Sequence, residues 1–217
     1  MSRFRPLLLL ALWCAAVYLW VALGLFAVKS AWLTMAVYHL ALCGGGWLRL
    51  RPSRPPRFAF KHAAPAILML SGGFILAWLV MVHLLPLLPP GVVPSVTTHG
   101  LSGVGLSART YPFIALYFGI VNPLAEEAFW RGRILPLLID ARSPAPNLLH
   151  ALVFTGFHLL PLALMFAPPA LPACIVFLGG FTFGAVALRS RNLLIPWALH
   201  TGVNAYLLIW FGRFFTT

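Results

Sequence analysis

Residues 122–133 read NPLAEEAFWRGR and place two adjacent glutamates, Glu126 and Glu127, between two apolar runs. The preceding run, 111–121, is YPFIALYFGIV, and the following run, 134–139, is ILPLLI. The whole chain has only three acidic residues, so two of them side by side in such surroundings require an explanation. The composition of the rest of the chain shows what these surroundings are.

The composition is that of a membrane protein. Hydrophobic residues make up 61% of the 217 residues and charged residues 8%, with a mean hydropathy of +0.94. These values lie outside the range of soluble globular domains. At ~20 apolar residues per transmembrane helix, a chain of this length holds about seven spans and leaves no room for a separate soluble domain. We therefore predict an all-α, polytopic transmembrane helix bundle that forms a single integral membrane domain over residues 1–217.

Apolar runs predict where the spans lie. They are expected at about 6–28, 30–48, 64–88, 111–139, 147–166, 170–188 and 192–211. The first run is too long for a signal peptide and lacks a cleavage site of small residues, which favours an anchored span. In the fourth, Asn122 and Pro123 resemble an N-cap followed by proline, which predicts a restart or kink just before the glutamates. In the sixth, Gly180 and Gly184 predict tight helix packing.

The net charge of +12 is explained by membrane orientation. Such a charge can also mark a nucleic-acid-binding surface, but here the arginines cluster in short gaps between apolar runs, where topology signals lie. With seven spans, one face collects Arg3, Arg5, Arg49, Arg51, Arg54, Arg57, Lys61, Arg142, Arg189 and Arg191, and the other collects Lys29, Arg109 and Arg213. Because cytoplasmic loops carry the excess of Lys and Arg, we expect the N-terminus and the loop 49–61 inside and the loop 89–107 outside. No nucleic-acid partner is expected.

Of the two glutamates, Glu127 has a partner on its own helix and Glu126 does not. Glu127 and Arg131 are four residues apart, so they share one helix face and form a structural ion pair. Glu126 points about 100° away, and its neighbours at i+3 and i+4 are Phe129 and Trp130. An ionisable side chain inside a membrane usually faces the bundle interior or a water-filled cavity and marks function. Glu126 therefore either has a partner on another span or acts as a general base.

Histidines on the late spans are the candidate partners. His158 lies in FTGFHLLP and His200 in WALHTGVNAY. A single histidine in a helix bundle is more often a hydrogen-bonded packing residue than a catalyst. His200 and Asn204, however, are four residues apart and share one face, so one helix presents an imidazole and a carboxamide together. Burying these groups with Glu126 in hydrocarbon would be costly without a function.

Three motifs in this order resemble those of the CAAX protease and bacteriocin-processing family of intramembrane proteases. They are EExxxR (Glu126, Glu127, Arg131), FxxxH (Phe154, His158) and HxxxN (His200, Asn204). Each motif alone is weak, but the ordered set on successive spans is specific. The resemblance covers about 110–211, the protease-like motif core. It implies a glutamic-type intramembrane endopeptidase acting on a membrane-associated peptide or protein, and the family includes prenyl-protein endopeptidases.

The resemblance also implies a role for each motif residue. Glu126 and His158 would activate a water molecule that attacks the peptide carbonyl. His200 and Asn204 would donate hydrogen bonds to the oxyanion, an interaction often worth about 3–4 kcal/mol per donor. The ion pair on the same helix as Glu126 would keep that glutamate in position.

Helix rise predicts that the site lies in the cytoplasmic half of the membrane. His158 and His200 lie about 16 Å and 12 Å from the cytoplasmic ends of their spans, and Glu126 lies roughly 20 Å from the end of its own. These depths overlap to within a few residues in a hydrocarbon core ~30 Å thick. We therefore expect one cavity that is open to the cytoplasm.

A metal site is the alternative mechanism. Glu126, His158 and His200 form a His₂Glu set like that of catalytic zinc sites. The sequence has no HExxH, however, and an asparagine rather than an acid follows His200 at helical spacing. We therefore favour a mechanism without a metal or other cofactor, and zinc bound by these three residues is the alternative.

Two functions without proteolysis are also consistent with buried glutamate and histidine. Some proteins of the resembling family act as non-catalytic membrane scaffolds or immunity proteins. Proton-coupled transporters bury such residues too, but they usually have repeated half-structures, and the sequence shows no repeat.

Arginine outnumbers lysine thirteen to two, which is typical of a GC-rich bacterial genome and indicates a bacterial cytoplasmic membrane.

Overall fold

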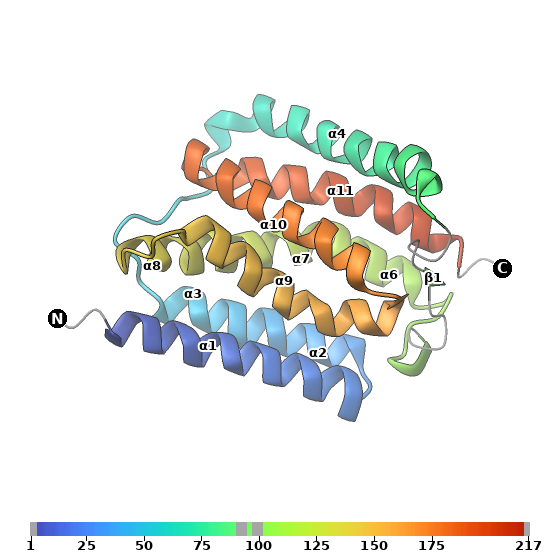
Figure 1. Ribbon diagram of the computed structural model, residues 1–217, viewed down its shortest axis with the longest axis horizontal. Coiled ribbons are helices and arrows are strands. Elements are labelled where there is room, and N and C mark those ends of the chain that lie inside the picture. The colour runs from blue at the N-terminus through green and yellow to red at the C-terminus, as the bar shows by residue number, and fades with distance from the viewer. Residues whose placement is uncertain (1–3, 90–94, 97–101, 215–217) are drawn as a thin grey trace.

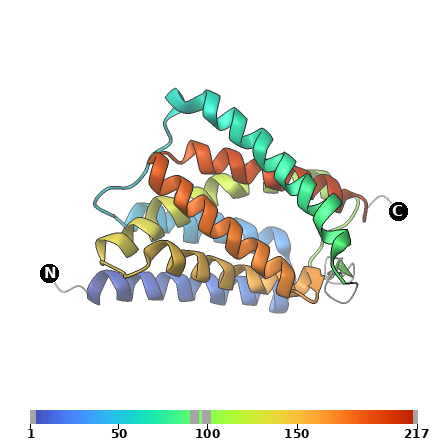
Figure 2. The same ribbon diagram turned by 45° about the horizontal axis from the view of Figure 1, so that its top comes forward.

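A computed structural model shows a bundle of helices that run roughly along one long axis (Figures 1 and 2). It describes residues 4–89, 95–96 and 102–214. Most of these residues are helical, and the strands among them are the short antiparallel pair β1 (Ser95–Val96) and β2 (Phe166–Ala167). The predicted all-α bundle is therefore confirmed.

The described helices join into seven long stretches, several of which change helix type along their length. The first three are α1 (Phe4–Ala22) with η1 (Leu23–Ala27); α2 (Ala31–Val37), η2 (Tyr38–Gly44) and α3 (Gly45–Arg49); and η3 (Phe60–His62), α4 (Ala63–Leu79), η4 (Val80–Leu84) and η5 (Leu85–Leu87). The others are α6 (Tyr111–Leu116), η6 (Tyr117–Val121), α7 (Asn122–Glu126), η7 (Glu127–Ile134) and α8 (Leu135–Asp140); α9 (Pro146–Met165); α10 (Ala170–Ser190); and α11 (Leu194–Gly212). Of the η elements, η3 and η5 are 3₁₀ turns and the rest are π-helical. Each predicted span corresponds to one stretch.

Five of these stretches are long and apolar enough to cross a membrane, judged over the described residues. They are Leu8–Ala27, Phe60–Leu87, Pro146–Met165, Ala170–Ser190 and Leu194–Gly212. The stretches 31–49 and 111–140 fall outside this set. The second of them carries Glu126, Glu127 and Arg131, which lower its hydropathy and are buried inside the protein. The chain is an integral membrane protein, and length and apolar composition identify five of the seven long helical stretches among the described residues.

The fourth span is continuous where the sequence predicts a restart. Asn122 has helical backbone angles (φ −59°, ψ −51°), and its amide donates to the carbonyl of Tyr117, five residues earlier. This π-helical spacing lets the chain pass Pro123, which has no amide hydrogen, without a break. The expected restart was therefore wrong, and a π-helical turn is present instead.

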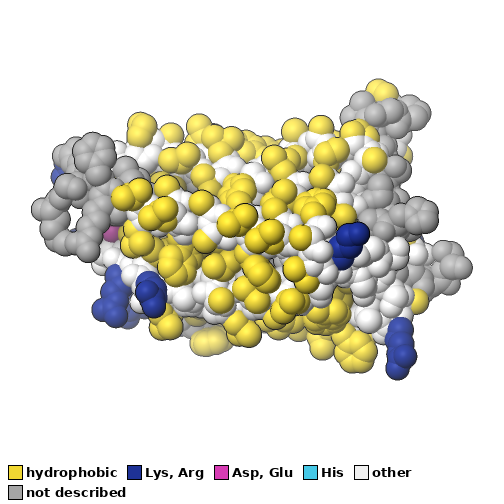
Figure 3. Space-filling view, turned by 90° about the horizontal axis from the view of Figure 1, so that it is seen from below, with side chains coloured by type: hydrophobic (Ala, Val, Ile, Leu, Met, Phe, Trp, Pro, Cys, Tyr) yellow, Lys and Arg dark blue, Asp and Glu magenta, His cyan; other side chains and the backbone are white. Residues whose placement is uncertain are grey.

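Large apolar side chains cover the outside of the bundle. Leu40 is 80% exposed and Leu178 is 63% exposed, whereas Trp130 and Arg131 are completely buried. Figure 3 shows a broad band of apolar side chains over one face, with basic side chains toward its two ends. An exposed leucine needs no protein partner when lipid surrounds it. The surface is therefore that of a bundle embedded in a bilayer.

Glycines set the closest helix contacts. The helix α4 packs along α11, and a Cβ atom at Gly73 would collide with the carbonyl oxygen of Leu199. Gly202 approaches the backbone of α4 in the same way. Between α9 and α10, a Cβ atom at Gly180 would lie 2.9 Å from the ring of Phe154, which confirms the predicted tight packing. These contacts fix α10 and α11 against their neighbours.

Loops from distant parts of the chain meet at one end of the bundle. The amide and hydroxyl of Ser53 donate to the carboxylate of Asp140 at 2.7 and 2.5 Å. The side chain of Asn192 exchanges two hydrogen bonds of 3.0 Å with the backbone of Ala59. The loop after α3 thus lies beside the ends of α8 and α10. In the predicted outer loop 89–107, residues 90–94 and 97–101 lie outside the described residues, as does Arg3.

We predict that Gly73→Ala destabilises the protein. The new methyl group would collide with the Leu199 carbonyl, and such overpacking typically costs about 1–3 kcal/mol. Thermal unfolding of the purified protein in detergent should show a lower Tm. Gly72→Ala is the matched control, because a Cβ atom there meets nothing within 4 Å. Equal Tm values for the two variants would contradict the close contact between α4 and α11.

Candidate active site

Three helices bring Glu126, His158 and His200 into one cluster. Glu126 is the last residue of α7, His158 lies in α9 and His200 lies in α11. Nε2 of His158 is 3.8 Å from Oε1 of Glu126, and Nε2 of His200 is 3.9 Å from Oε2 of Glu126. Glu126 is buried, whereas the side chain of His158 is 20% exposed. The residues singled out from the sequence therefore converge, and His158 is the most open of the three.

Glu127 links two helices of the cluster. Its Oε1 lies 3.1 Å from Nη1 of Arg131 and 3.0 Å from Nδ1 of His200. The side chains of Glu127 and Arg131 are both completely buried. The predicted pairing of Glu127 with Arg131 is therefore present. The sequence did not indicate that the same carboxylate oxygen also holds His200 from α11.

Hydrogen bonds at Nδ1 determine which ring nitrogen of each histidine faces Glu126. In His158, Nδ1 lies 2.8 Å from the carbonyl oxygen of Phe154. A carbonyl oxygen only accepts, so Nδ1 is the donor and Nε2 of the neutral ring keeps a lone pair. In His200, Nδ1 likewise donates to the carboxylate of Glu127. Both histidines therefore direct Nε2 toward Glu126.

Aromatic rings enclose Arg131. Its guanidinium carbon lies 4.2 Å from the ring centroid of Phe154 and 5.5 Å from that of Phe183. The ring of Phe183 also stacks on His200, with centroids 5.0 Å apart. Such cation–π contacts stabilise a desolvated guanidinium. These contacts give Phe154, the phenylalanine of FxxxH, a physical role. Phe183 could not be singled out from the sequence, because it is one of 17 phenylalanines and has no distinctive spacing.

A further residue at the site, Tyr38, comes from η2. Its hydroxyl accepts a hydrogen bond of 2.8 Å from Nε1 of Trp130 and interacts with the carboxyl of Glu126. Its ring stacks on Phe157, with centroids 4.9 Å apart, and the residue is completely buried. Tyr38 could not be found from the sequence, because it lies far from the motif core and a tyrosine in an apolar run gives no signal.

Asn204 has a backbone partner that the sequence did not indicate. Its Nδ2 donates to the carbonyl oxygen of Phe118 at 2.9 Å. In a helix, the Phe118 carbonyl would accept a hydrogen bond from the amide four or five residues later. Here the amide of Asn122 donates to Tyr117 instead, and Pro123 has no amide hydrogen. Asn204 therefore satisfies a carbonyl group left by the π-helical turn η6. Nδ2 carries a second hydrogen that can serve another acceptor.

The residues of the zinc alternative do not form a metal site as they are arranged. Within the described part of the chain, no group of three His, Cys, Asp or Glu side chains could hold a metal ion. The two oxygens of Glu126 face different histidines. Nδ1 of each histidine is hydrogen-bonded to another protein group, an arrangement that zinc-binding histidines also have, so Nε2 of each ring is the nitrogen that a zinc ion would use. Zinc bound by these three residues stays the alternative, and the mechanism proposed for this site has no step through a metal.

Residues 108–206 match the family model described as type II CAAX prenyl endopeptidase Rce1-like. The matched segment contains all three motifs, from Glu126 to Asn204. It is consistent with the CAAX protease and bacteriocin-processing family, and the resemblance seen in the sequence is confirmed. A match of this kind supports an intramembrane endopeptidase in general. Neither the search of curated proteins nor the search of solved structures found a significant match.

We predict that Glu127→Gln strongly destabilises the protein. The change leaves the buried guanidinium of Arg131 without its carboxylate, and breaking a buried pair in this way typically costs about 3–5 kcal/mol. Thermal unfolding in detergent should show a large fall in Tm and a lower yield of folded protein. Glu126→Gln is the control, because it makes the same change at the adjacent residue without removing that ion pair. A similar fall in both variants would refute the structural role of Glu127.

Proposed function

We propose that the chain is a glutamic-type intramembrane endopeptidase in which Glu126 and His158 activate a water molecule. The observation that supports this most directly is the 3.8 Å separation between Oε1 of Glu126 and Nε2 of His158. This distance is too long for a direct hydrogen bond, yet one water molecule between the two atoms can contact both. Both atoms are acceptors, so they take the two hydrogens of the water and leave an oxygen lone pair for attack.

The reaction proposed for this pair moves one proton through Glu126. The water oxygen bonds to the peptide carbonyl carbon while its proton passes to the Glu126 carboxylate, and the carbonyl π electrons move onto the carbonyl oxygen. When the C–N bond breaks, Glu126 gives the proton to the leaving amine and becomes a carboxylate again. Glu126 therefore acts first as a general base and then as a general acid, and His158 orients the water.

We assign stabilisation of the oxyanion to His200, with Asn204 as the second donor. Because Nδ1 of His200 donates to Glu127, Nε2 can donate only when the ring is an imidazolium. The cluster then holds two carboxylates, Glu126 and Glu127, balanced by Arg131 and the imidazolium. A site without net charge is the least costly to bury in a membrane. Each donor to the oxyanion can supply about 3–4 kcal/mol in the transition state.

The proposed substrate is a membrane-associated peptide or protein with its scissile bond in or just under the cytoplasmic leaflet. The depths of Glu126, His158 and His200, calculated from helix rise, overlap on the side of the arginine-rich loops. Those loops lie together at one end of the bundle, as the contacts of Ser53 and Asn192 show. We therefore place the protein in the bacterial cytoplasmic membrane, with its N-terminus inside and a water-filled site entered from the cytoplasm.

We predict that Glu126→Gln abolishes proteolysis and leaves a folded protein in the membrane. The amide cannot accept the proton of the attacking water, so hydrolysis of a membrane-associated reporter peptide should fall by at least about 100-fold. Size-exclusion chromatography of the detergent-solubilised variant would check that it is folded. Full cleavage by this variant would refute the assignment of the base.

Two comparisons sharpen this test. Asp140→Asn removes the third acidic residue of the chain, which binds Ser53 in a loop, and should retain activity. Zinc chelation should leave the wild-type rate unchanged, and a loss restored by zinc would support the metal alternative. If Glu126→Gln keeps the cellular function of the wild type, the native role is that of a scaffold or immunity protein.

Orientation gives a separate prediction. Single cysteines introduced at Arg54 and at Gly103 should behave differently toward an impermeant thiol reagent applied to intact cells. The Gly103 position should be labelled from outside, and the Arg54 position should be labelled only after the membrane is opened. A cysteine-free background, with Cys14, Cys43 and Cys174 replaced, is the control. Labelling of the Arg54 position in intact cells would contradict an inside N-terminus with seven spans.

A further inference from the structure

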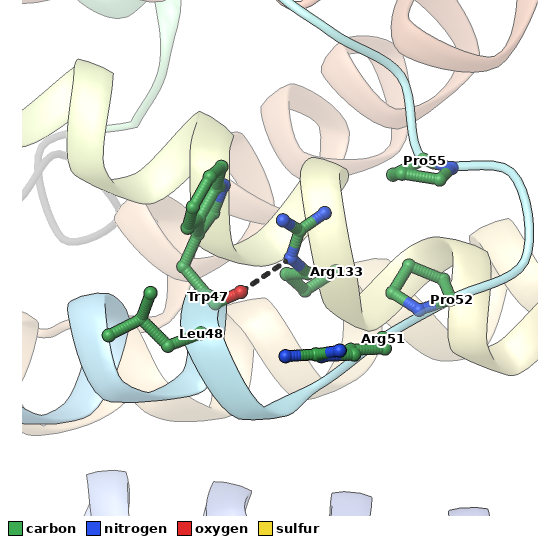
Figure 4. A pocket seen from close by; sticks show the side chains of 6 residues that line it. All are labelled: Trp47, Leu48, Arg51, Pro52, Pro55 and Arg133. Atoms are coloured by element: carbon green, nitrogen blue, oxygen red, sulfur yellow. Dashed lines mark hydrogen bonds between the residues drawn. The ribbon is translucent and has the colours of Figure 1, made fainter.

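A basic pocket lies at the end of the bundle where α3 runs into the following loop, away from the catalytic cluster. It is a cavity of about 290 Å³. Its lining residues are Trp47, Leu48, Arg51, Pro52, Pro55 and Arg133. Figure 4 shows these six side chains around the pocket, with Arg133 next to Trp47. The two prolines come from the loop, and Arg133 comes from η7, so the pocket joins three separate parts of the fold.

Arg133 is held in place by Trp47. Its Nε donates to the Trp47 carbonyl at 3.0 Å, and its guanidinium carbon lies 4.4 Å from the centroid of the Trp47 ring. Nη1 of Arg133 donates to the carbonyl of Gly132 at 3.2 Å. A guanidinium has five N–H groups, so three remain for a ligand. The guanidinium of Arg133 is therefore held in a fixed position in the pocket and still has N–H groups that can bind a ligand.

The positive charge of the pocket is not neutralised by the protein. Among the residues that the structure describes, no carboxylate lies within salt-bridge distance of Arg51 or Arg133. The acid of the neighbouring segment, Asp140, is already bound by the amide and hydroxyl of Ser53. Two guanidinium groups that line one cavity without a counter-ion attract an anion, and phosphate oxygens match the fork of N–H donors on arginine.

We propose that this pocket binds the phosphodiester headgroup of an anionic membrane lipid. The phosphate would contact Arg51 and Arg133, and the acyl chains would extend along the outer surface of α3. Trp47 and Leu48, at the pocket rim, are 47% and 65% exposed and give those chains an apolar surface. Tryptophan is also enriched at the membrane interface, and basic pockets between membrane helices bind lipid headgroups. A lipid can pair its phosphate with the two arginines and place its acyl chains against Trp47 and Leu48, whereas free phosphate can only pair with the arginines.

A lipid bound here would contact η7, the helix that directly follows Glu126 and carries Glu127 and Arg131. Arg133 lies two residues after Arg131, the partner of Glu127. The helix η7 is also packed closely against α3, because a Cβ atom at Gly46 would collide with the ring of Phe129. A headgroup between Arg51 and Arg133 would tie the end of α3 to η7. Lipid binding is therefore expected to stabilise the folded protein as well as to occupy the pocket.

The test is lipid binding by the purified full-length protein in a neutral detergent, measured by native mass spectrometry. Phosphatidylglycerol should bind, and phosphatidylcholine, whose ammonium group repels arginine, should bind more weakly. Arg51→Gln and Arg133→Gln should each weaken phosphatidylglycerol binding about fivefold, because one arginine near a lipid headgroup contributes roughly 1 kcal/mol. The matched control is Arg54→Gln, an exposed arginine of the same loop that does not line the pocket; it should leave binding unchanged.

Three results would overturn the proposal. An equal loss of binding in Arg54→Gln would show that only the general charge of the loop matters. Displacement of the lipid by inorganic phosphate at an equal concentration would show that the ligand is a soluble anion. If Arg51→Gln leaves lipid binding intact but raises the KM for a peptide with a free C-terminal carboxylate, the pocket serves the substrate instead. Arg51 is exposed, so its variant remains informative even if Arg133→Gln fails to fold.

Discussion

The rest of the structure depends on one buried carboxylate, that of Glu127. Its Oε1 meets Arg131 on its own helix and His200 on α11, with no exposure of the glutamate or the arginine. A charge buried in the protein interior within a bilayer is costly unless it is paired, so the contacts of this oxygen constrain both the rotation of η7 and the position of α11. Phe154 and Phe183 complete the enclosure by placing their rings against the guanidinium. Glu126, the adjacent residue, is thereby presented to the two histidines.

The π-helical turns around this carboxylate have a related effect. The turn η6 carries the chain past Pro123 without a break, and η7 begins directly at Glu127. A π-helical turn changes the angle between successive side chains, which alters the faces that Glu126 and Glu127 occupy relative to a regular α-helix. The turn also leaves the carbonyl of Phe118 to the side chain of Asn204. Backbone irregularity and site geometry are therefore coupled through α11.

The parts of the site that are predictable from sequence are those whose residue type is improbable in hydrocarbon. Glu126, Glu127, Arg131, His158 and His200 stand out for that reason, and helical spacing alone is enough to pair Glu127 with Arg131. Tyr38 and Phe183 cannot be found in this way, because aromatic residues are common in membrane spans. The restart expected at Pro123 was wrong because local rules treat proline as a break, whereas π-helical spacing and a side chain from another helix compensate for it here.

The link from Glu127 to His200 has a consequence for biogenesis. A ribosome delivers η7 to the membrane well before α11, which follows it by about sixty residues, so during synthesis Glu127 has Arg131 but lacks its second partner. Glycine contacts between α4 and α11 also form only at that late stage. The proposed catalytic cluster is therefore incomplete until α11 has been made. Completion of the proposed site and completion of the helix bundle are therefore one event.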